Sequence, residues 1–315
     1  MANIFIDGQA GTTGLHITER LEKRNDLKLL QIKEADRKNQ RVKKEVLNEA
    51  DLVVLCLPDE AAKESHGLIE NPKTRILDAS SAHRTDPEWV YGLPELGSGQ
   101  REKIITAQRV SNPGCYPTGF ILLTAPLRKK ELLSKDHPIT VQGISGFSGG
   151  GRKLIEKFET VSANDSSSWS FRPYGFSLDH KHLPEMKKYA HLDHEPVFLP
   201  GVANLDRGLL VLVPLALSQI RPKPDLKQIH QVLSEAYQDE TFIKVFPLND
   251  QSVLSDGFLS AGDLKGTNRV ELFVFGNVER AVLVARLDNL GKGASGAAIQ
   301  NINLMLGINE STGLI

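Results

Sequence analysis

The sequence predicts an α/β protein: a Rossmann-type, doubly wound parallel sheet, followed by a second α+β domain with a mixed or antiparallel sheet. Three observations lead to this fold class. The first third alternates short apolar strands with helical stretches, the strands lengthen and their gaps become irregular from Ile139 onward, and the last residues return to a helical pattern. Strands that alternate with crossover helices are typical of a parallel sheet.

The first third contains four expected strands separated by three expected helices. The run Leu52–Leu57 is unbroken, apolar and closed by Pro58, which is typical of a central parallel strand. The other strands are expected at Ile4–Ile6, Leu27–Ile32 and Arg75–Asp78. The helices are expected at Leu15–Leu21, around Val42, Val46 and Leu47, and at Ala61–Ile69.

The second half predicts a different sheet and a closing helix. Its strands are expected at Ile139–Ile144, Gly208–Leu217, Val270–Phe275 and Ala281–Leu287. Ala294–Leu306 carries an apolar stripe and is followed by Gly307 as a C-cap, so it is expected to be a helix that packs back on the first domain. The predicted domains are residues 1–114 together with the C-terminal helix 294–315, and residues 115–293.

Composition excludes several classes of protein. The 315 residues include 38 Lys plus Arg and 39 Asp plus Glu, and this balance gives no support to a nucleic-acid partner or a basic membrane anchor. Two cysteines exclude a disulfide scaffold. The longest apolar stretch, Leu209–Leu217, contains Pro214 and is too short to span a bilayer. With no signal-like layout at the start, we expect a cytoplasmic protein.

A glycine-rich turn follows the first expected strand. Gly8, Gly11 and Gly14 are spaced three residues apart, with Thr12 and Thr13 between them at the start of a helix. Small residues let the backbone approach a pyrophosphate, and the helix N-terminus offers N–H groups and partial positive charge. The alternative is a βα turn that binds nothing.

The residues after the second expected strand bear on the choice of cofactor. Lys33, Arg37 and Lys38 suit the 2′-phosphate of NADP, whereas Glu34 and Asp36 keep NAD open. A solvated charged turn is the alternative. We predict NADP as the cofactor, with Lys33 and Arg37 among its ligands.

The two cysteines lie in different sequence contexts. Pro113 and Gly114 precede Cys115, and a helix-compatible run, Phe120–Leu127, follows it. A position at or near a helix start lowers the pKa of a thiol and exposes it, which makes a nucleophile. Cys56 lies within an apolar strand and is expected to be a buried small hydrophobe.

The cysteine segment resembles the nucleophile motif of N-acetyl-γ-glutamyl-phosphate reductases, relatives of aspartate-semialdehyde dehydrogenase. Thr12, Lys181 and Leu183 depart from residues common among relatives. The length is similar to the shorter, type 2 branch of the family. The resemblance rests on segments spread over the whole chain: residues 111–118 (SNPGCYPT), 78–84 (DASSAHR), 91–96 (YGLPEL), 143–152 (GISGFSGGGR), 180–186 (HKHLPEM), 266–271 (GTNRVE) and 292–298 (KGASGAA).

This resemblance implies reduction of N-acetyl-γ-glutamyl phosphate by NADPH, in arginine biosynthesis. Cys115 is expected to form a thioester, and a histidine to carry protons near neutral pH. The family motif favours His180 as this acid/base residue, with His182 as the second candidate. Pro184 is expected to keep their segment from continuing as a helix, and Glu185 could orient an imidazole.

Further residues are expected around an anionic substrate. Arg84 is the first choice for the phosphate, and Gly293 is expected near the nicotinamide. Ser145, Ser148, Arg152 and Glu185 complete the predicted substrate site. No metal is expected. A reductase acting on aspartyl phosphate or a carrier-bound aminoadipyl phosphate, and a non-catalytic NADP sensor, remain alternatives. The second domain is expected to carry catalysis and to form a homo-oligomer, a dimer or a tetramer.

Overall fold

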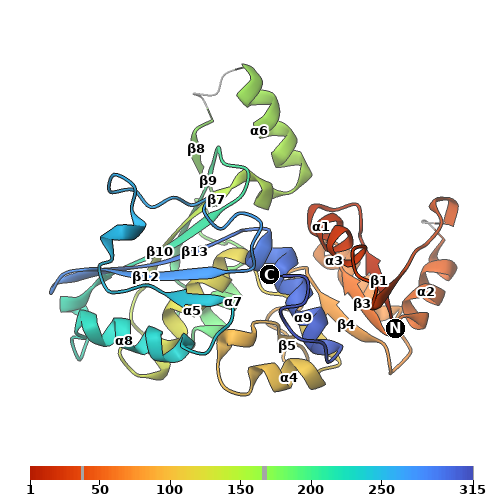
Figure 1. Cartoon of the computed structure of the whole chain (residues 1–315), viewed down its shortest axis with the longest axis horizontal. Helices are drawn as coiled ribbons and strands as arrows, with labels where there is room; N and C mark the ends of the chain where they lie inside the picture. The colour runs from red at the N-terminus through yellow and green to blue at the C-terminus, as the bar shows by residue number, and fades with distance from the viewer. Residues whose placement is uncertain (37–38, 165–168, 315) are drawn as a thin grey trace. The chain divides into compact units, whose positions relative to one another are not determined.

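The computed structural model describes residues 1–36, 39–164 and 169–314, with the backbone alone for 161–164. These residues form two compact units (Figure 1). The first unit comprises Met1–Pro94, Ser98–Pro113 and Ala294–Ile315, and the second comprises Glu95–Gly97 and Gly114–Gly293. The chain therefore enters the second unit directly before Cys115 and leaves it directly after Gly293.

A parallel sheet organises the first unit, as predicted, but it has six strands rather than the four expected. Its strand order is β2-β1-β3-β4-β6-β5, so the direction of winding reverses between β1 and β3. In such sheets the reversal point creates a crevice at the carboxyl ends of the strands. The strands are β1 (Ala2–Asp7), β2 (Leu27–Leu30), β3 (Leu52–Leu55), β4 (Arg75–Asp78), β5 (Val90–Tyr91) and β6 (Arg109–Ser111).

Helices cover both faces of this sheet. Right-handed crossovers place α1 on one face and α2 and α3 on the other. Helix α9 contacts α1, α4 and β4. The core beneath α2 and α3 includes Phe5, Leu47, Val53 and Ala62. The helices are α1 (Thr12–Leu21), α2 (Gln40–Glu49), α3 (Asp59–Gly67), α4 (Gln100–Thr106) and α9 (Gly296–Met305).

A seven-stranded mixed sheet forms the frame of the second unit, which confirms the predicted second sheet. The order is β11-β12-β13-β10-β7-β9-β8, with β7–β9 and β11–β12 parallel and the other pairs antiparallel. The strands are β7 (Thr140–Gly146), β8 (Phe171–Pro173), β9 (Val197–Ala203), β10 (Leu209–Ala216), β11 (Ile243–Val245), β12 (Val270–Gly276) and β13 (Arg280–Leu287).

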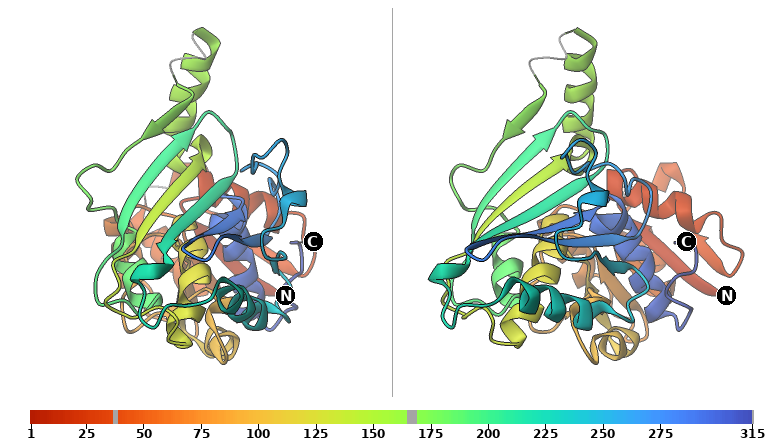
Figure 2. Two further views of the ribbon diagram at one scale, coloured as in Figure 1. Left: turned by 90° about the vertical axis from the view of Figure 1, so that its left-hand side faces the viewer. Right: turned by 60° about the vertical axis from the view of Figure 1, so that its left-hand side comes forward.

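Helix α5 (Cys115–Lys129) packs against the middle of this sheet, on β10 and β13, and contacts α7 (Leu183–Tyr189) and α8 (Leu226–Tyr237) (Figure 2). Strand β10 alternates accordingly, with Val211 and Val213 buried toward the helices and Pro214 exposed on the opposite face. Strand β7 is followed by a short 3₁₀ turn at Phe147–Gly150 and then by helix α6 (Arg152–Asn164).

One expectation at a helix start differs from the structure. Pro184 does not prevent a helix, because α7 begins at Leu183 and holds Pro184 in its first turn, where the missing N–H of proline costs no hydrogen bond. Helix α5 begins at Cys115 itself, which confirms the expected position of this residue at or near a helix start, and it extends beyond the helix-compatible run Phe120–Leu127. Its early residues are buried, so tertiary packing extends the helix beyond its apolar run.

A π-turn at Gly291–Ser295 leads into α9. Every residue of α9 is buried, including Gln300, Asn301 and Asn303. Two of these amides bind backbone groups of the first unit: Asn301 donates to Gly92 O at 2.8 Å, and Asn303 donates to Thr312 O at 2.9 Å. The helix is thus fixed in the first unit by hydrogen bonds as well as by apolar packing.

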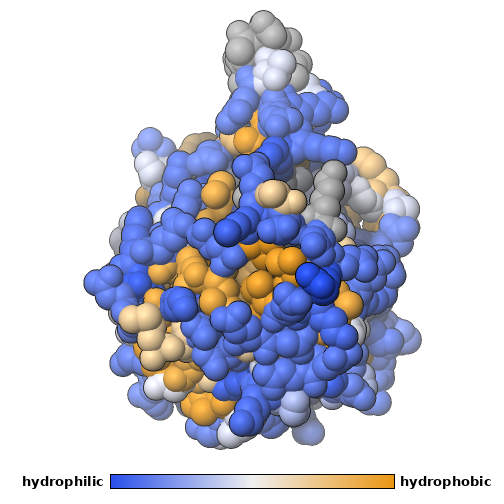
Figure 3. All heavy atoms as spheres, turned by 90° about the vertical axis from the view of Figure 1, so that its right-hand side faces the viewer, coloured by the Kyte–Doolittle hydropathy of each residue, from blue (hydrophilic) through white to orange (hydrophobic). Residues whose placement is uncertain are grey.

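Among the described residues, no helix is both long enough and apolar enough to cross a bilayer. The face of the molecule drawn in Figure 3 is mostly hydrophilic, with apolar side chains gathered near its middle.

Candidate functional site

The glycine turn after β1 has the geometry of an anion-binding helix start. Gly8 has φ +95°, and a Cβ there would lie 2.3 Å from the carbonyl oxygen of Cys56, so only glycine fits. Gly11 is the N-cap of α1, and no side chain caps this helix. Thr12, Thr13 and Gly14 form its first turn. The turn therefore presents backbone N–H groups beside the sheet.

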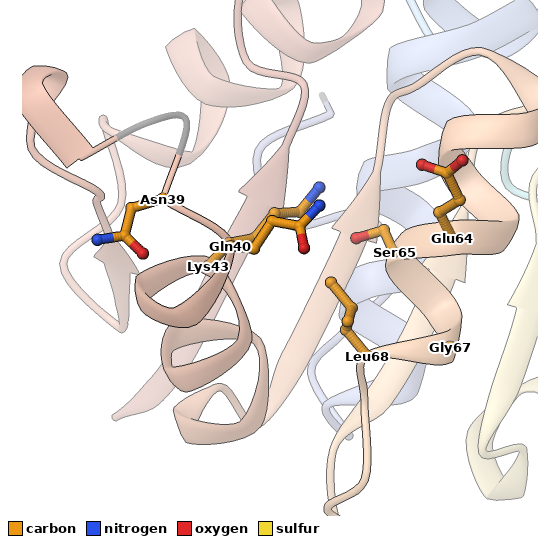
Figure 4. A pocket seen from close by; sticks show the side chains of 7 residues that line it. All are labelled: Asn39, Gln40, Lys43, Glu64, Ser65, Gly67 and Leu68. Carbon is orange, nitrogen blue, oxygen red and sulfur yellow. The ribbon is translucent and has the colours of Figure 1, made fainter.

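A polar pocket of about 490 Å³ lies between α2 and α3 in the same unit (Figure 4). Gln40 and Lys43 extend into it from α2 toward Ser65 of α3. Lys43 Nζ pairs with Asp7 at 2.6 Å, and the Ser65 hydroxyl donates to the same carboxylate at 2.5 Å. Asp7 ends β1 directly before Gly8, so these contacts fix the strand end from which the glycine turn departs.

The predicted cofactor residues after β2 are only partly described. Lys33 is exposed, and its carbonyl accepts from the N–H of Asp36 at 2.9 Å. Arg37 lies outside the described residues.

The loop after β4 holds Arg84. Arg84 is buried and its Nε donates to the carbonyl of Asn112 at 3.0 Å. The preceding residue, His83, has its Nδ1 2.7 Å from Asp78 and stacks on Trp89 with 4.2 Å between ring centroids. Asp78 is fully buried. The charged and aromatic partners of His83 therefore fix the loop on which Arg84 lies.

Cys115 is the first residue of α5, with Gly114 as an N-cap that lacks a side-chain hydrogen bond. The residue is partly exposed. A Cβ on Gly293 would lie 2.7 Å from the Cβ of Cys115, so the backbone of the π-turn contacts the cysteine directly. Gly293 thus lies beside the predicted nucleophile in the second unit.

Cys56, like Cys115, is partly exposed as a residue, but the surroundings of its thiol differ. Burial, and then the negative charges of Asp78 and Asp7, raise the pKa of its thiol to about 12. The thiol form therefore persists at neutral pH, in line with a structural residue.

The two predicted histidines lie side by side ahead of α7. Their ring centroids are 4.7 Å apart, and Nδ1 of His180 accepts from the backbone N–H of His182 at 3.2 Å. The ring of Tyr116, which follows Cys115 in the chain, contacts both: its centroid is 6.2 Å from that of His180 and 5.9 Å from that of His182. The structure therefore brings the cysteine segment and the histidine segment together.

Because Nδ1 of His180 is an acceptor here, the neutral ring carries its proton on Nε2. That nitrogen lies 3.5 Å from the hydroxyl of Tyr174. Burial raises the pKa of Tyr174 to about 12, so this phenol is neutral in the physiological range.

Glu185 contacts the cysteine loop. Its carboxylate is buried on α7, and Oε2 accepts from the N–H of Gly114 at 3.1 Å. A buried carboxylate on the residue before Cys115 fixes the start of α5. This hydrogen bond was not part of the sequence-based assignment of Glu185 to the substrate.

The small-residue loop after β7 is held by its own unit. The Ser148 hydroxyl donates to Asp206 O at 2.6 Å and accepts from Asn289 at 2.9 Å, and the Ser145 hydroxyl donates to Gly146 O at 3.0 Å. Both serines are buried. Arg152 is exposed at the start of α6.

Sequence reasoning did not single out Tyr174, or the buried ion pair of Lys292 with Glu95. The pair joins residues 197 positions apart at 2.6 Å. Each residue lies within a segment of the family resemblance, but spacing along the chain gives no sign that the two meet.

Known protein families match both units. The family described as semialdehyde dehydrogenase, NAD binding domain, matches residues 3–106, and semialdehyde dehydrogenase, dimerisation domain, matches residues 115–289. The chain is 48% identical to N-acetyl-gamma-glutamyl-phosphate reductase 2 of Nostoc sp. over 317 residues, covering 99% of this chain and 98% of the relative. It is 47% identical to N-acetyl-gamma-glutamyl-phosphate reductase of Brucella canis over 307 residues, covering 96% and 98%.

The chain belongs to the N-acetyl-γ-glutamyl-phosphate reductase family.

Solved structures of aspartate semialdehyde dehydrogenases share the fold of this chain. Aspartate semialdehyde dehydrogenase II of Vibrio cholerae superimposes with a TM-score of 0.72 at 15% identity, covering 98% of both chains. Aspartate semialdehyde dehydrogenase of Candida albicans, solved with NADP, superimposes with a TM-score of 0.65 at 13% identity, covering 98% of this chain and 99% of that chain.

Proposed function

We propose that this chain reduces N-acetyl-γ-glutamyl phosphate to N-acetyl-glutamate semialdehyde with NADPH, releasing phosphate through a thioester on Cys115. The observation that carries the mechanism is the position of Cys115: first residue of a 15-residue helix, partly exposed, and joined through Tyr116 to two histidines. Membership in the N-acetyl-γ-glutamyl-phosphate reductase family supports N-acetyl-γ-glutamyl phosphate as the substrate. As a biosynthetic enzyme, the protein is expected to be cytoplasmic.

The start of α5 suits a thiolate, because unsatisfied N–H groups and the helix dipole stabilise negative charge there. The sulfur attacks the acyl carbon, the carbon–oxygen bond to phosphate breaks, and inorganic phosphate leaves with the bonding electrons. A thioester accepts hydride far more readily than a carboxylate does, which is why the covalent step is needed.

A nicotinamide dinucleotide supplies the hydride. Its pyrophosphate fits the glycine turn of Gly8, Gly11 and Gly14, where the geometry leaves no room for side chains at Gly8 and the first turn of α1 has no side-chain cap. We propose that Lys33 and Arg37 favour NADP over NAD through the 2′-phosphate.

His180 is proposed as the proton carrier. With its proton on Nε2, the neutral ring donates a hydrogen bond to the oxyanion that hydride transfer leaves on the tetrahedral intermediate. That oxyanion collapses to the aldehyde as the carbon–sulfur bond breaks, and the sulfur leaves as the thiolate. The proton on Nε2 is defined by the hydrogen bond to Nδ1 from the His182 N–H. His182, also near Tyr116, is the second candidate.

Arg84 is proposed to bind the phosphate of the substrate, with Ser145, Ser148 and Arg152 at the remaining anionic and acyl groups. The buried Glu185 is proposed to support the substrate site through Gly114, whose N–H it accepts.

The reverse reaction tests this function. NADP reduction is measured with N-acetyl-glutamate semialdehyde plus phosphate, with aspartate semialdehyde plus phosphate, and with NAD in place of NADP. We expect turnover with the acetylated substrate and NADP, and loss of at least about 1,000-fold in kcat for Cys115→Ser. Full activity of that variant would exclude the covalent route, and faster turnover of aspartate semialdehyde would reassign the substrate.

A further inference from the structure

The ion pair of Lys292 and Glu95 lies in the interior of the second unit. The two side chains have no exposed surface, and Nζ is 2.6 Å from Oε1. Nζ also lies 5.6 Å from the centre of the Phe242 ring. Removing two charges from water is costly, and replacing a buried pair by apolar residues is often neutral or stabilising. Stability alone therefore accounts poorly for this pair.

One half of the pair belongs to the backbone that contacts the nucleophile. Lys292 lies in the π-turn Gly291–Ser295, directly before Gly293, which leaves no space for a Cβ beside Cys115. The N–H of Gly293 donates to Asp288 O at 2.9 Å. π-turns are rare and are frequently found at functional sites.

The other half lies far away in sequence. Glu95 is in a 3₁₀ turn, Pro94–Leu96, and Glu95–Gly97 is grouped with the second unit although the residues on either side belong to the first. Its charge also acts on Tyr237: burial first, and then the Glu95 charge, raise the pKa of that phenol well above its ordinary value. The pair thus anchors the π-turn to a separate segment.

We propose that Lys292 and Glu95 are positioning residues for Cys115: their buried ion pair holds the π-turn against the first turn of α5 and so sets the orientation of the thiol. This inference rests on the proposed role of Cys115 as nucleophile. Neither residue is expected to touch the substrate, so their loss should slow the chemical step and leave substrate binding nearly unchanged.

Four variants test the proposal. Lys292→Met removes one charge, Lys292→Met with Glu95→Met removes both while keeping apolar volume, and Lys292→Arg keeps the cation but displaces it. Lys223→Met is the matched control, since its partner Glu279 lies at 2.8 Å in an exposed pair of the same unit. The measurements are kcat, KM, the melting temperature, and the rate of Cys115 alkylation by iodoacetamide against pH.

We expect the double variant and Lys292→Arg to melt near the unmodified protein, with KM within about twofold, kcat lowered at least about tenfold, and an altered pH profile of Cys115 alkylation. The control should match the unmodified protein throughout. The proposal is overturned if a folded Lys292→Arg or double variant keeps kcat and the alkylation profile, or if kcat falls only in proportion to stability. Activity in Cys115→Ser would instead defeat the proposed function itself, independently of these variants.

Discussion

The thiols of Cys56 and Cys115 show how surroundings determine the chemistry of one residue type. Cys56 follows β3, with its N–H bound to Asp7 O at 2.7 Å, and burial raises the pKa of its thiol to about 12. Cys115 begins a helix and is partly exposed. Only a thiolate reacts with an alkylating agent, so the two should differ in rate.

We expect iodoacetamide to modify Cys115 and to leave Cys56 unmodified from about pH 6 to about pH 9, because the Cys56 thiol titrates only near pH 12 in the folded protein. Peptide mass spectrometry measures both sites. In guanidinium chloride the two cysteines should react alike. Modification of Cys56 in the folded protein at a rate similar to that of Cys115 would contradict this view of its burial.

Gly293 gives a second residue-scale prediction. The Cβ of a Gly293→Ala variant would lie 2.7 Å from the Cβ of Cys115 and 3.1 Å from Asp288 O, so the backbone must move. Overpacking of this kind costs about 1–3 kcal/mol. We expect a lower melting temperature and a kcat reduced at least about tenfold. Gly262→Ala is the control, since the nearest atom to its Cβ would be 3.5 Å away; equal behaviour of both variants would refute the steric argument.

The candidate site was predictable where chemistry is local. Gly114 and Pro113 beside Cys115 indicate a helix start, and His180 and His182 lie within three consecutive residues of the sequence. The Tyr174 hydroxyl beside His180, and Glu95 beside Lys292, are contacts made only by tertiary folding. No periodicity connects such residues, so the sequence alone could not pair them.

At the scale of elements, α3 carries a titratable contact. His66, in its last turn, lies 5.6 Å from the His83 ring and 5.3 Å from the Trp89 ring. Burial first, then the charges of Arg109 and His83, lower the pKa of His66 below its ordinary value, while Asp78 and Asp86 act in the opposite direction. The helix therefore packs best with His66 neutral.

This lowered pKa predicts a loss of stability in acid. As pH falls below about 6.5, the unfolded chain binds a proton at His66 before the folded chain does, so the free energy of unfolding decreases down to the folded pKa. Above about pH 7.5 His66 contributes no pH dependence. Thermal unfolding at about pH 7.5 and about pH 5.5 should show a smaller pH-induced drop for His66→Gln than for the unmodified protein. An equal drop would show that other groups carry the effect.

Helices and strands with a strong apolar pattern were predictable from the sequence, whereas the boundaries that depend on neighbouring strands or helices were not. The run Leu52–Leu57 correctly predicted a central parallel strand, whose four residues Leu52–Leu55 are all buried, but the strand ends before Cys56 and Leu57, which are only partly buried. The expected strand Leu27–Ile32 ends at Leu30, and strand boundaries depend on the neighbouring strand, β1. Pro184 likewise could not be interpreted from the sequence alone, because a proline occurs both in the first turn of a helix and in segments that form no helix.

At the scale of the molecule, the outer surface of β7, β9 and β10 is a candidate contact between copies. Val197 and Leu199 on β9 are 49% and 45% exposed. Leu199 pairs in register with Gln142 of β7, which pairs with Leu212 of β10, so these three side chains lie on the same face of the sheet. The match of this unit to a dimerisation domain supports self-association. This surface is the part of the sheet opposite α5.

We expect the protein to form a homo-oligomer through this outer surface. Light scattering at micromolar concentration should give a mass above 34.7 kDa, and Leu199→Lys should move it toward that monomer value, since a desolvated ammonium is costly in an interface. Val278→Lys is the matched control, because Val278 lies in the turn between β12 and β13, outside this surface, and is 78% exposed. A monomer in the unmodified protein would exclude the assembly, and an unchanged mass in Leu199→Lys would place the contact elsewhere.

The two-sheet architecture was predictable because the hydrophobic pattern changes between the halves of the chain. The pairing order in each sheet was not, because β8 and β11 are short and carry too few residues to show a period. The insertion of β9 between β7 and β8 also depends on contacts absent from local sequence.

The discontinuous first unit has a consequence for how the protein is made. Its sheet strands are all present by Ser111, yet α9, which packs against α1, α4 and β4, is encoded at the end of the chain. On the ribosome the N-terminal strands must therefore wait for the final residues to emerge, while the contiguous segment from Gly114 to Gly293 can condense earlier. A nascent chain stalled before Ala294 would expose the apolar surface that α9 normally covers, and so would be prone to chaperone capture or degradation.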